Sequence, residues 1–367
     1  MSLRSWLIGI GAGLVAIAYV FFVMAKNGMD PTILLAEGTD AIVQLEYAEL
    51  RLGRSIATRP ELGHDGKFFF IQASDPFLMD PENNAVFLDR PLYRSQRMLY
   101  PALASIFGLM PAAAIVWGLI AINVLGVVAG SAITAEIASG QGSSRLLGVT
   151  FVLNPGVIAE IDIDGAGVIA LAFGLAGLLC VTRKNFWAAT VFLSLAVLSR
   201  ETMILMALGL LIGAWIFQRS YKVQLLVIPA LIAGLWRLVA SFRLDAAGID
   251  TTGGYSAYGA ALDFPFRGFV QAIPFWGGSP NDLLFTIALL TIVVLGLGRA
   301  ALRPSLIGWS AMPFALLLVF ISIHVWIEPF DIARTMIPIF TVYPLLAFSS
   351  SRSGERLAPY EVRAREV

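Results

Sequence analysis

Residues 63–97, which read GHDGKFFFIQASDPFLMDPENNAVFLDRPLYRSQR, form the longest polar interruption in an apolar chain. This stretch carries acids and arginines together and lies between two apolar segments. Of the 367 residues, 58% are hydrophobic and 14% are charged, and the mean hydropathy is +0.80. A soluble domain would carry about a quarter charged residues. The composition therefore predicts a membrane protein in which this stretch is a loop outside the hydrocarbon.

The apolar residues come in blocks long enough to cross a hydrocarbon core as helices, which takes about 20 residues each. A transmembrane barrel would show short alternating segments instead. We therefore expect an all-α polytopic bundle, with one transmembrane domain over 1–350 and a flexible cytoplasmic tail over 351–367. The segment 98–110 is expected to be an interfacial or re-entrant helix. Ten spans are expected near residues 6–25, 111–135, 146–160, 166–182, 186–200, 202–218, 223–242, 283–299, 305–326 and 335–350.

Lysines and arginines indicate how the spans are oriented. With the N-terminus inside, the cytoplasmic segments collect 12 of the 25 bases but only four of the 25 acids. This is the positive-inside pattern, so both termini are expected in the cytoplasm and the loops 26–97 and 243–282 outside. Acids contribute little to orientation, and their enrichment outside suggests a site built from carboxylates. The zero net charge argues against a nucleic-acid partner.

Asp65 is the first candidate for chemistry. It lies in Gly63-His-Asp-Gly66, and the flanking glycines let a ligand approach the backbone closely. A carboxylate at this place can take the proton of an acceptor hydroxyl as a general base. Asp-Gly is also a common turn dipeptide, so a solvated turn aspartate is the alternative.

Arginines follow at Arg90, Arg94 and Arg97, spaced four and three apart, so they share one face if the stretch is helical. The planar guanidinium group binds two phosphate oxygens at once, which makes this face a candidate anion site. Arginines that reach lipid headgroups are the alternative. Arg200 and Arg334 lie at the outer ends of apolar spans, where contact with the membrane interface or interhelical ion pairing is the alternative to ligand binding.

The turn from Glu160 to Asp164 places three acids in alternation between two predicted spans. Acids beside hydrocarbon are costly and usually face a cavity. Asp162 and Asp164 could bind a divalent cation through oxygen, or they could simply lie in a hydrated turn before the next helix. His64 and His324 are the only histidines, which excludes a histidine-rich metal site.

Four short motifs stand out: Asp65-Gly with three phenylalanines at 68–70, Asp75-Pro-Phe, Tyr93-Arg-x-x-Arg97 leading into Leu-Tyr-Pro, and Ser199-Arg-Glu-Thr. With the predicted topology, these motifs resemble the GT-C class of integral-membrane glycosyltransferases. The similarity in topology covers most of the chain, whereas the similarity in sequence is limited to these few short motifs. Two features depart from the class: the first loop lacks an adjacent acidic pair, and no large soluble C-terminal domain follows.

The resemblance implies a GT-C-like fold in the bacterial inner membrane and transfer of a sugar outside the cytoplasm, usually with inversion. The donor would be a polyprenyl-phosphate-linked sugar and the acceptor a lipid, glycan or protein. No cofactor is required with a monophosphate donor; with a pyrophosphate donor, Mg²⁺ or Mn²⁺ at Asp162 and Asp164 stays open. Asp65 would be the base, and Arg90, Arg94, Arg97, Arg200 and Arg334 would clamp the donor phosphate. Further substrate contacts are expected from His64, Asp75, Tyr93, Glu201, Trp276 and His324.

Two other classes remain open: a transporter or flippase for a lipid-linked or anionic substrate, and a non-catalytic assembly subunit. A transporter would place charges near the midplane and repeat broken helices in two halves. Here the charges collect at one face and no second half mirrors the first, which favours one-sided chemistry. We therefore expect Asp65, Asp162 and Arg334 to converge on one outward-facing cavity.

Overall fold

The computed structural model describes residues 1–251, 262–276 and 279–348. Over these ranges the ordered elements are helices, accompanied only by isolated β-bridges, so the all-α prediction is confirmed. The predicted tail, 351–367, lies outside the described residues.

Within the described ranges, five helices are long and apolar enough to cross a membrane, judged by length and composition. A sixth span results if the bent pair α18 (Pro329–Thr335) and α19 (Ile337–Ala347), which meet at 69°, is taken as one. These helices confirm the membrane-compatible character of the chain. The five are α1 (Leu3–Ala25), α7 (Ala113–Gly140), α12 (Ile204–Gln218) with the 3₁₀ turn Glu201–Met203 before it, α13 (Ile228–Ala246) with Tyr221–Val227 before it, and α15 (Pro280–Leu302).

Three further apolar helices cover predicted spans but are shorter than the about 20 residues that a perpendicular crossing needs. The predicted span 146–160 is broken between α8 (Val149–Val152) and α9 (Pro155–Asp162), because the side chain of Asn154 caps α9 and Pro155 occupies its first position. The count of ten spans therefore stays a prediction. The three shorter helices are α10 (Gly167–Thr182), α11 (Phe186–Ser199) and α16 (Leu306–Phe320).

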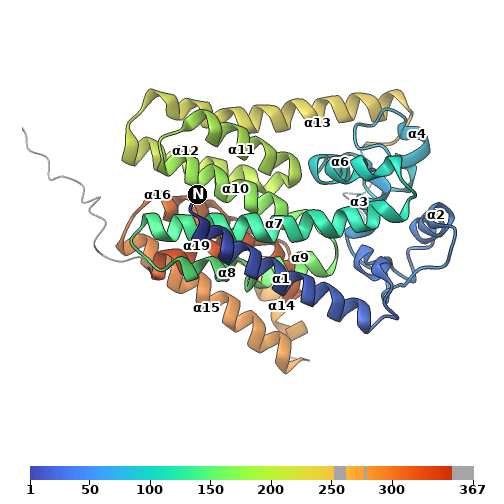
Figure 1. Ribbon diagram of the computed structural model, residues 1–367, viewed down its shortest axis with the longest axis horizontal. Helices are drawn as coiled ribbons and strands as arrows, with labels where there is room; N and C mark the ends of the chain where they lie inside the picture. The colour runs from blue at the N-terminus through green and yellow to red at the C-terminus, as the bar shows by residue number, and fades with distance from the viewer. Residues whose placement is uncertain (252–261, 277–278, 349–367) are drawn as a thin grey trace, which may run out of the picture.

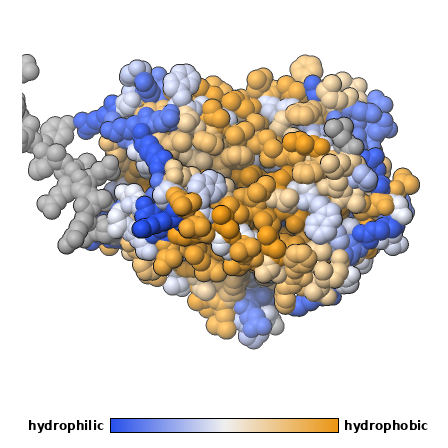
Figure 2. All heavy atoms as spheres, in the orientation of Figure 1, coloured by the Kyte–Doolittle hydropathy of each residue, from blue (hydrophilic) through white to orange (hydrophobic). Residues whose placement is uncertain are grey.

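The helices form one bundle in which α1 packs on α7, α7 on α10, α10 on α11, and α12 on α16. Figure 1 shows α7 and α13 running along the long direction of the molecule, with the helices of the first loop gathered at one end. Figure 2 shows a broad apolar surface over the middle of this face and polar residues mainly toward its two ends. A broad apolar surface of this kind is suited to contact with lipid. On α13 the exposed apolar side chains are Leu231, Leu235, Leu238 and Phe242.

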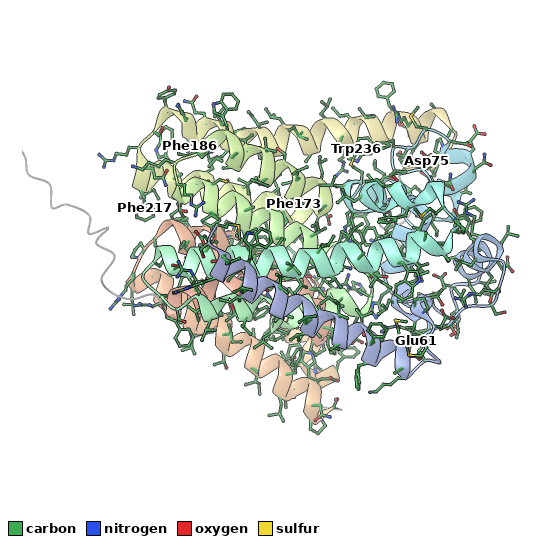
Figure 3. The ribbon with its side chains drawn as sticks, in the orientation of Figure 1. Glu61, Asp75, Phe173, Phe186, Phe217 and Trp236 are labelled. Carbon is green, nitrogen blue, oxygen red and sulfur yellow. The ribbon has the colours of Figure 1, made fainter. Side chains whose placement is uncertain are left out.

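The first loop folds into short helices. One of them is α2, and the segment 98–110 is helical as predicted. The indole nitrogen of Trp236 on α13 (Figure 3) donates to the carbonyl of Ser95 at 2.7 Å, which ties this loop to the bundle. The elements are Pro31–Leu35, α2 (Ile42–Leu52), α3 (Gly66–Gln72), α4 (Pro81–Asn84), Ala85–Phe87, α5 (Pro91–Ser95), α6 (Leu99–Ser105) and Ile106–Leu109; later come Arg145–Gly148, α14 (Arg267–Trp276) and α17 (Ile323–Trp326).

Candidate active site

The backbone at Gly66 brings the first loop onto the turn that follows α9. A Cβ atom at Gly66 would lie 2.5 Å from the carbonyl oxygen of Ile163 and 2.7 Å from that of Leu35. Real Cβ atoms do not approach backbone oxygens so closely, so this contact requires glycine. The close approach holds Asp65 beside the C-terminal end of α9.

The carboxylate of Asp65 lies among three arginines. Its Oδ1 is 2.6 Å from Nη1 of Arg94, and its Oδ2 is 2.6 Å from Nη2 of Arg334 and 3.3 Å from Nη1 of Arg97. Burial alone would raise the pKa of Asp65, but the guanidinium groups of Arg94, Arg334 and Arg97 outweigh it and hold the pKa well below its usual range. Three guanidinium groups contact the carboxylate, so the solvated-turn alternative does not apply.

Two of these arginines are each fixed from behind by a second carboxylate. Arg94 donates from Nε and Nη2 to Asp89, at 2.8 and 2.9 Å. Arg97 donates from Nε and Nη2 to Glu201, at 2.8 and 2.9 Å. Such two-point pairs fix the plane of the guanidinium group. The remaining Nη1 of each arginine is directed at Asp65.

The third arginine, Arg334, belongs to the bent pair of helices. Its Nη1 is 2.9 Å from Asp331, and its Nε is 3.0 Å from Oε1 of Glu160. Arg200 also pairs with Oε1 of Glu160, whose Oε2 accepts the backbone N–H of Gly167 at 2.8 Å. Glu160 is 1% exposed, so this pairing is what makes its charge tolerable. These ion pairs join nine residues, which we call the Asp65 network: Asp65, Asp89, Arg94, Arg97, Glu160, Arg200, Glu201, Asp331 and Arg334.

A second glycine makes this packing feasible. A Cβ atom at Gly167 would lie 2.6 Å from Cδ of Glu160 and 2.7 Å from Nη1 of Arg200. The start of α10 thus lies directly against the ion pair. For Arg200 and Arg334, the structure realises the interhelical ion pairing that the sequence left open, and through Glu160 it connects both to Asp65.

Tyr93 and Arg90 lie at the edge of the Asp65 network. The hydroxyl of Tyr93 accepts a hydrogen bond from Nη2 of Arg97. Arg90 has its Nε 3.9 Å from Asp89 and its guanidinium carbon 5.0 Å from the ring centre of Tyr93. The predicted face of arginines at 90, 94 and 97 is thus assembled around one tyrosine ring.

Asp162 and Asp164 face different partners. Asp162 is 2.6 Å from Nη1 of Arg59 and accepts from the hydroxyl of Tyr19 at 3.1 Å. Asp164 faces Asn123, whose amide nitrogen is 3.4 Å from Oδ1. In the part of the chain that the structure describes, no three His, Cys, Asp or Glu side chains are grouped so as to hold a metal ion. The metal assignment remains a prediction from sequence, with Asp162 already neutralised by arginine.

Of the remaining candidates, Asp75 caps a turn, since its carboxylate accepts the backbone N–H groups of Met79 and Asp80 at 2.7 and 2.8 Å. Trp276 is buried and donates to the carbonyl of Trp326 at 2.8 Å, so its ring is part of the core. His64 and His324 are exposed and join no ion pair of the Asp65 network that the structure describes. Glu201 is in the network through Arg97. Residues 252–261 of the predicted outer loop 243–282 lie outside the described residues.

Asp65 and Arg334, which the sequence predicts to lie together, form an ion pair. The expected third member, Asp162, is instead bound by Arg59. The acid of this turn that contacts Arg334 is Glu160 rather than Asp162. The roles of Asp89 and Asp331 as partners of arginines were not predicted. Each is close to its arginine in sequence, five and three residues away, and that proximity was the available signal.

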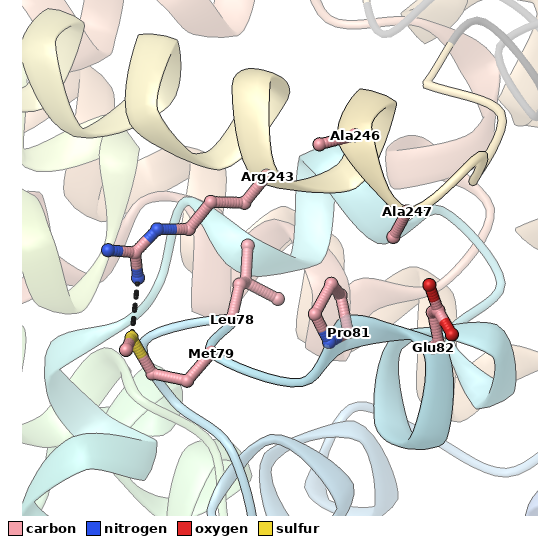
Figure 4. A pocket seen from close by; sticks show the side chains of 7 residues that line it. All are labelled: Leu78, Met79, Pro81, Glu82, Arg243, Ala246 and Ala247. Carbon is pink, nitrogen blue, oxygen red and sulfur yellow. Dashed lines mark hydrogen bonds between the residues drawn. The ribbon is translucent and has the colours of Figure 1, made fainter.

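An open hollow of about 310 Å³ lies between the loop before α4 and the end of α13 (Figure 4). In the close-up, Arg243 reaches from the helix toward the loop, where its Nη1 is 3.2 Å from the sulfur of Met79. It also donates to the carbonyl of Phe77. This hollow is lined by none of the Asp65 network, so the expected shared cavity is not formed there. Its lining is Leu78, Met79, Pro81, Glu82, Arg243, Ala246 and Ala247.

Two further charged side chains, Glu37 and Lys67, are buried outside the Asp65 network. Glu37 is fully buried, and neither of its carboxylate oxygens has a hydrogen-bond partner among the described residues. Burial raises the pKa of Glu37 to about 7, although the charge of Lys67 opposes the shift. Lys67 donates to the carbonyl of Leu62, which holds the start of the loop against α3.

No family model, curated protein or solved structure matched the chain in the three comparisons. The class of protein is therefore inferred from the fold and the candidate site alone. The protein is an all-helical bundle with membrane-compatible helices and, at one end, a network in which one carboxylate is enclosed by three oriented arginines.

Proposed function

We propose that the protein is an integral-membrane glycosyltransferase of the GT-C type that moves a sugar from a polyprenyl-phosphate donor to an acceptor outside the cytoplasm. The observation that carries the proposal is the meeting of Asp65 with Arg94, Arg97 and Arg334, from distant parts of the chain, at one point. A carboxylate and several arginines are the groups that this reaction needs.

In the proposed reaction, Asp65 accepts the proton of the acceptor hydroxyl while that oxygen attacks the anomeric carbon. The bond from this carbon to the phosphate oxygen breaks, and its electron pair leaves with the polyprenyl phosphate. The phosphate gains one negative charge, which Arg94, Arg97 and Arg334 stabilise. Attack opposite the leaving group inverts the anomeric centre. Arg200 acts through Glu160, which it helps to hold in place for Arg334.

The proposed setting is a bacterial inner membrane crossed by ten spans, with both termini cytoplasmic and the Asp65 network outside. Ser143, just after the C-terminal end of α7, donates from its hydroxyl to the carbonyl of Phe348, so α19 ends at the end of α7 opposite the first loop, which supports this orientation. The acceptor is a lipid, a glycan or a protein. No step of the proposed reaction uses a metal ion; Mg²⁺ or Mn²⁺ would enter only with a pyrophosphate donor.

The test is transfer of labelled sugar from polyprenyl-phosphate donors in membranes that contain the wild type, Asp65→Asn or Arg94→Ala. Both variants should lose transfer by roughly 100-fold or more, since each removes a group that acts on the transition state. Arg54→Ala is the control, because Arg54 forms its own two-point pair with Asp30 elsewhere in the loop. Normal transfer by both variants beside an active wild type would remove the mechanism.

One observation favours a transporter of a lipid-linked anion as the second candidate. Arg334 lies two residues before the bend of 69° between α18 and α19, and broken helices hold ligands in many transporters. Vesicles with reconstituted protein distinguish the two functions. Movement of a phosphate-linked lipid across the bilayer without any sugar transfer would favour the transporter.

A further inference from the structure

The three arginines around Asp65 are oriented independently of it. Nε and Nη2 of Arg94 are bound by Asp89, and Nε and Nη2 of Arg97 by Glu201. In each case one nitrogen, Nη1, is left for Asp65.

Arg334 follows the same pattern. Its Nε is bound by Glu160 and its Nη1 by Asp331, which leaves Nη2 for Asp65. Three N–H donors, each anchored from behind, therefore converge on one anion. Withdrawal of the Asp65 carboxylate would leave these donors oriented, because their rear partners do not depend on it.

Such a set of donors fits a phosphate as well as a carboxylate, since guanidinium groups bind both through the same N–H···O geometry. The exposed fractions of the four side chains indicate which of them is most readily displaced. The side chain of Asp65 is 18% exposed, whereas those of Arg94, Arg97 and Arg334 are 9%, 7% and 10% exposed. The side chain of Asp65 is thus the most exposed of these four.

Resting on the proposed function, we infer that Asp65 is an internal stand-in for the donor phosphate: its carboxylate occupies the three-arginine site in the free protein, and the phosphate displaces it on binding. The displaced carboxylate then lies beside the bound donor and is free to take the proton of the acceptor hydroxyl. Donor binding thereby switches Asp65 from an ion-paired anion into a base.

The arginines around Asp65 also determine how strong a base its carboxylate is. While three guanidinium groups hold it, the pKa of Asp65 is far below its usual range, and such a carboxylate is a weak base. Once the phosphate takes over the three N–H donors, that cause is removed and the pKa rises. The base is therefore weak until the leaving group is in place, which protects the site from premature proton transfer.

Affinity for a phosphate lipid tests the inference, because a stand-in must compete with the ligand. The full chain in detergent is titrated with a polyprenyl monophosphate and, as a matched probe, with the corresponding polyprenol. Asp65→Asn and Asp65→Ala should bind the phosphate lipid about tenfold or more tightly than the wild type, since a charged competitor is lost. Binding of the polyprenol should not change.

Asp30→Asn is the matched control. Asp30 forms a two-point pair with Arg54 in the same loop and is 19% exposed, nearly the same as Asp65. Removal of its charge should leave the affinity for the phosphate lipid unchanged. If Asp65→Ala does not fold, Asp65→Asn decides, because its amide oxygen still accepts one arginine N–H.

Unchanged or weaker phosphate-lipid binding by Asp65→Asn overturns the inference, and so does an equal gain in Asp30→Asn. Failure of the inference is distinguishable from failure of the proposed function. If Asp65→Asn loses sugar transfer without a gain in affinity, the transferase stands and the stand-in role falls. If wild-type protein neither prefers the phosphate lipid over the polyprenol nor transfers sugar, both fall.

Discussion

Asp65 and Asp164 are neighbours across the contact of Gly66 with Ile163, yet their surroundings are opposite. Asp65 has three arginines, whereas Asp164 has one amide at 3.4 Å and an Oδ2 without a hydrogen-bond partner among the described residues. The arginines hold the pKa of Asp65 low, while burial raises the pKa of Asp164 well above its usual value. At these two positions, burial raises the pKa of an acid, and neighbouring guanidinium groups lower it.

The largest effect should come from Arg334→Ala, which removes one partner from Asp65 and one from the buried Glu160. We expect a loss of about 3 kcal/mol in the free energy of unfolding, the scale seen when a buried pair is broken from one side. Denaturant unfolding in detergent measures it. Arg59→Ala should cost much less, because its partner Asp162 is 26% exposed. Equal losses in the two variants would show that burial does not determine how much stability is lost when an ion pair is broken.

The helical fold and the arginines of the candidate site are predictable from the sequence, but the full set of their partners is not. The spacing of Arg94 and Arg97 is local, so a short-range rule could predict one shared face. The pairing of Glu160 with Arg334 spans 174 residues and depends on how α9 meets the bent helices. Alternation of acids at 160, 162 and 164 could not tell which carboxylate faces the site, because a helix end turns each in a different direction.

The two aspartates should also differ in how pH changes stability. The folded-state pKa of Asp65 is depressed, so its contribution is present above about pH 4 and is lost as the pH falls through that depressed value. The pKa of Asp164 is raised, so the folded protein binds the extra proton and stability falls as the pH rises above about 4.

Thermal unfolding from acid to weakly alkaline pH should therefore give difference curves of opposite slope. Asp65→Asn should lower the melting temperature most near neutral pH. Asp164→Asn should raise it by about 2–4 °C near pH 8 and change it little near pH 4. A fall in melting temperature for Asp164→Asn at pH 8 would mean that Asp164 is charged in the folded protein.

Glu37→Gln extends the comparison to an acid with one cation nearby. Because burial raises the pKa of Glu37 to about 7 from 4.5, its ionisation should destabilise the protein progressively between these two values. The variant should unfold at a slightly higher temperature than the wild type near pH 8 and at the same temperature near pH 4. The gain should be smaller than for Asp164→Asn, because Lys67 offsets part of the cost of the Glu37 charge. An equal or larger gain would contradict this order.

The smallest change is expected for Asp162→Asn, at less than about 1 kcal/mol in the free energy of unfolding. Arg59 binds Asp162 through its carboxylate, but it also donates to the backbone carbonyls of Asp162, at 2.6 Å, and Ile33, at 3.3 Å. These two bonds survive the substitution, and the new amide oxygen can still accept from Tyr19. A loss comparable with that of Arg334→Ala would show that the carboxylate, not the carbonyls, holds Arg59. The turn after α9 would then depend on two charged acids, Glu160 and Asp162, rather than on one.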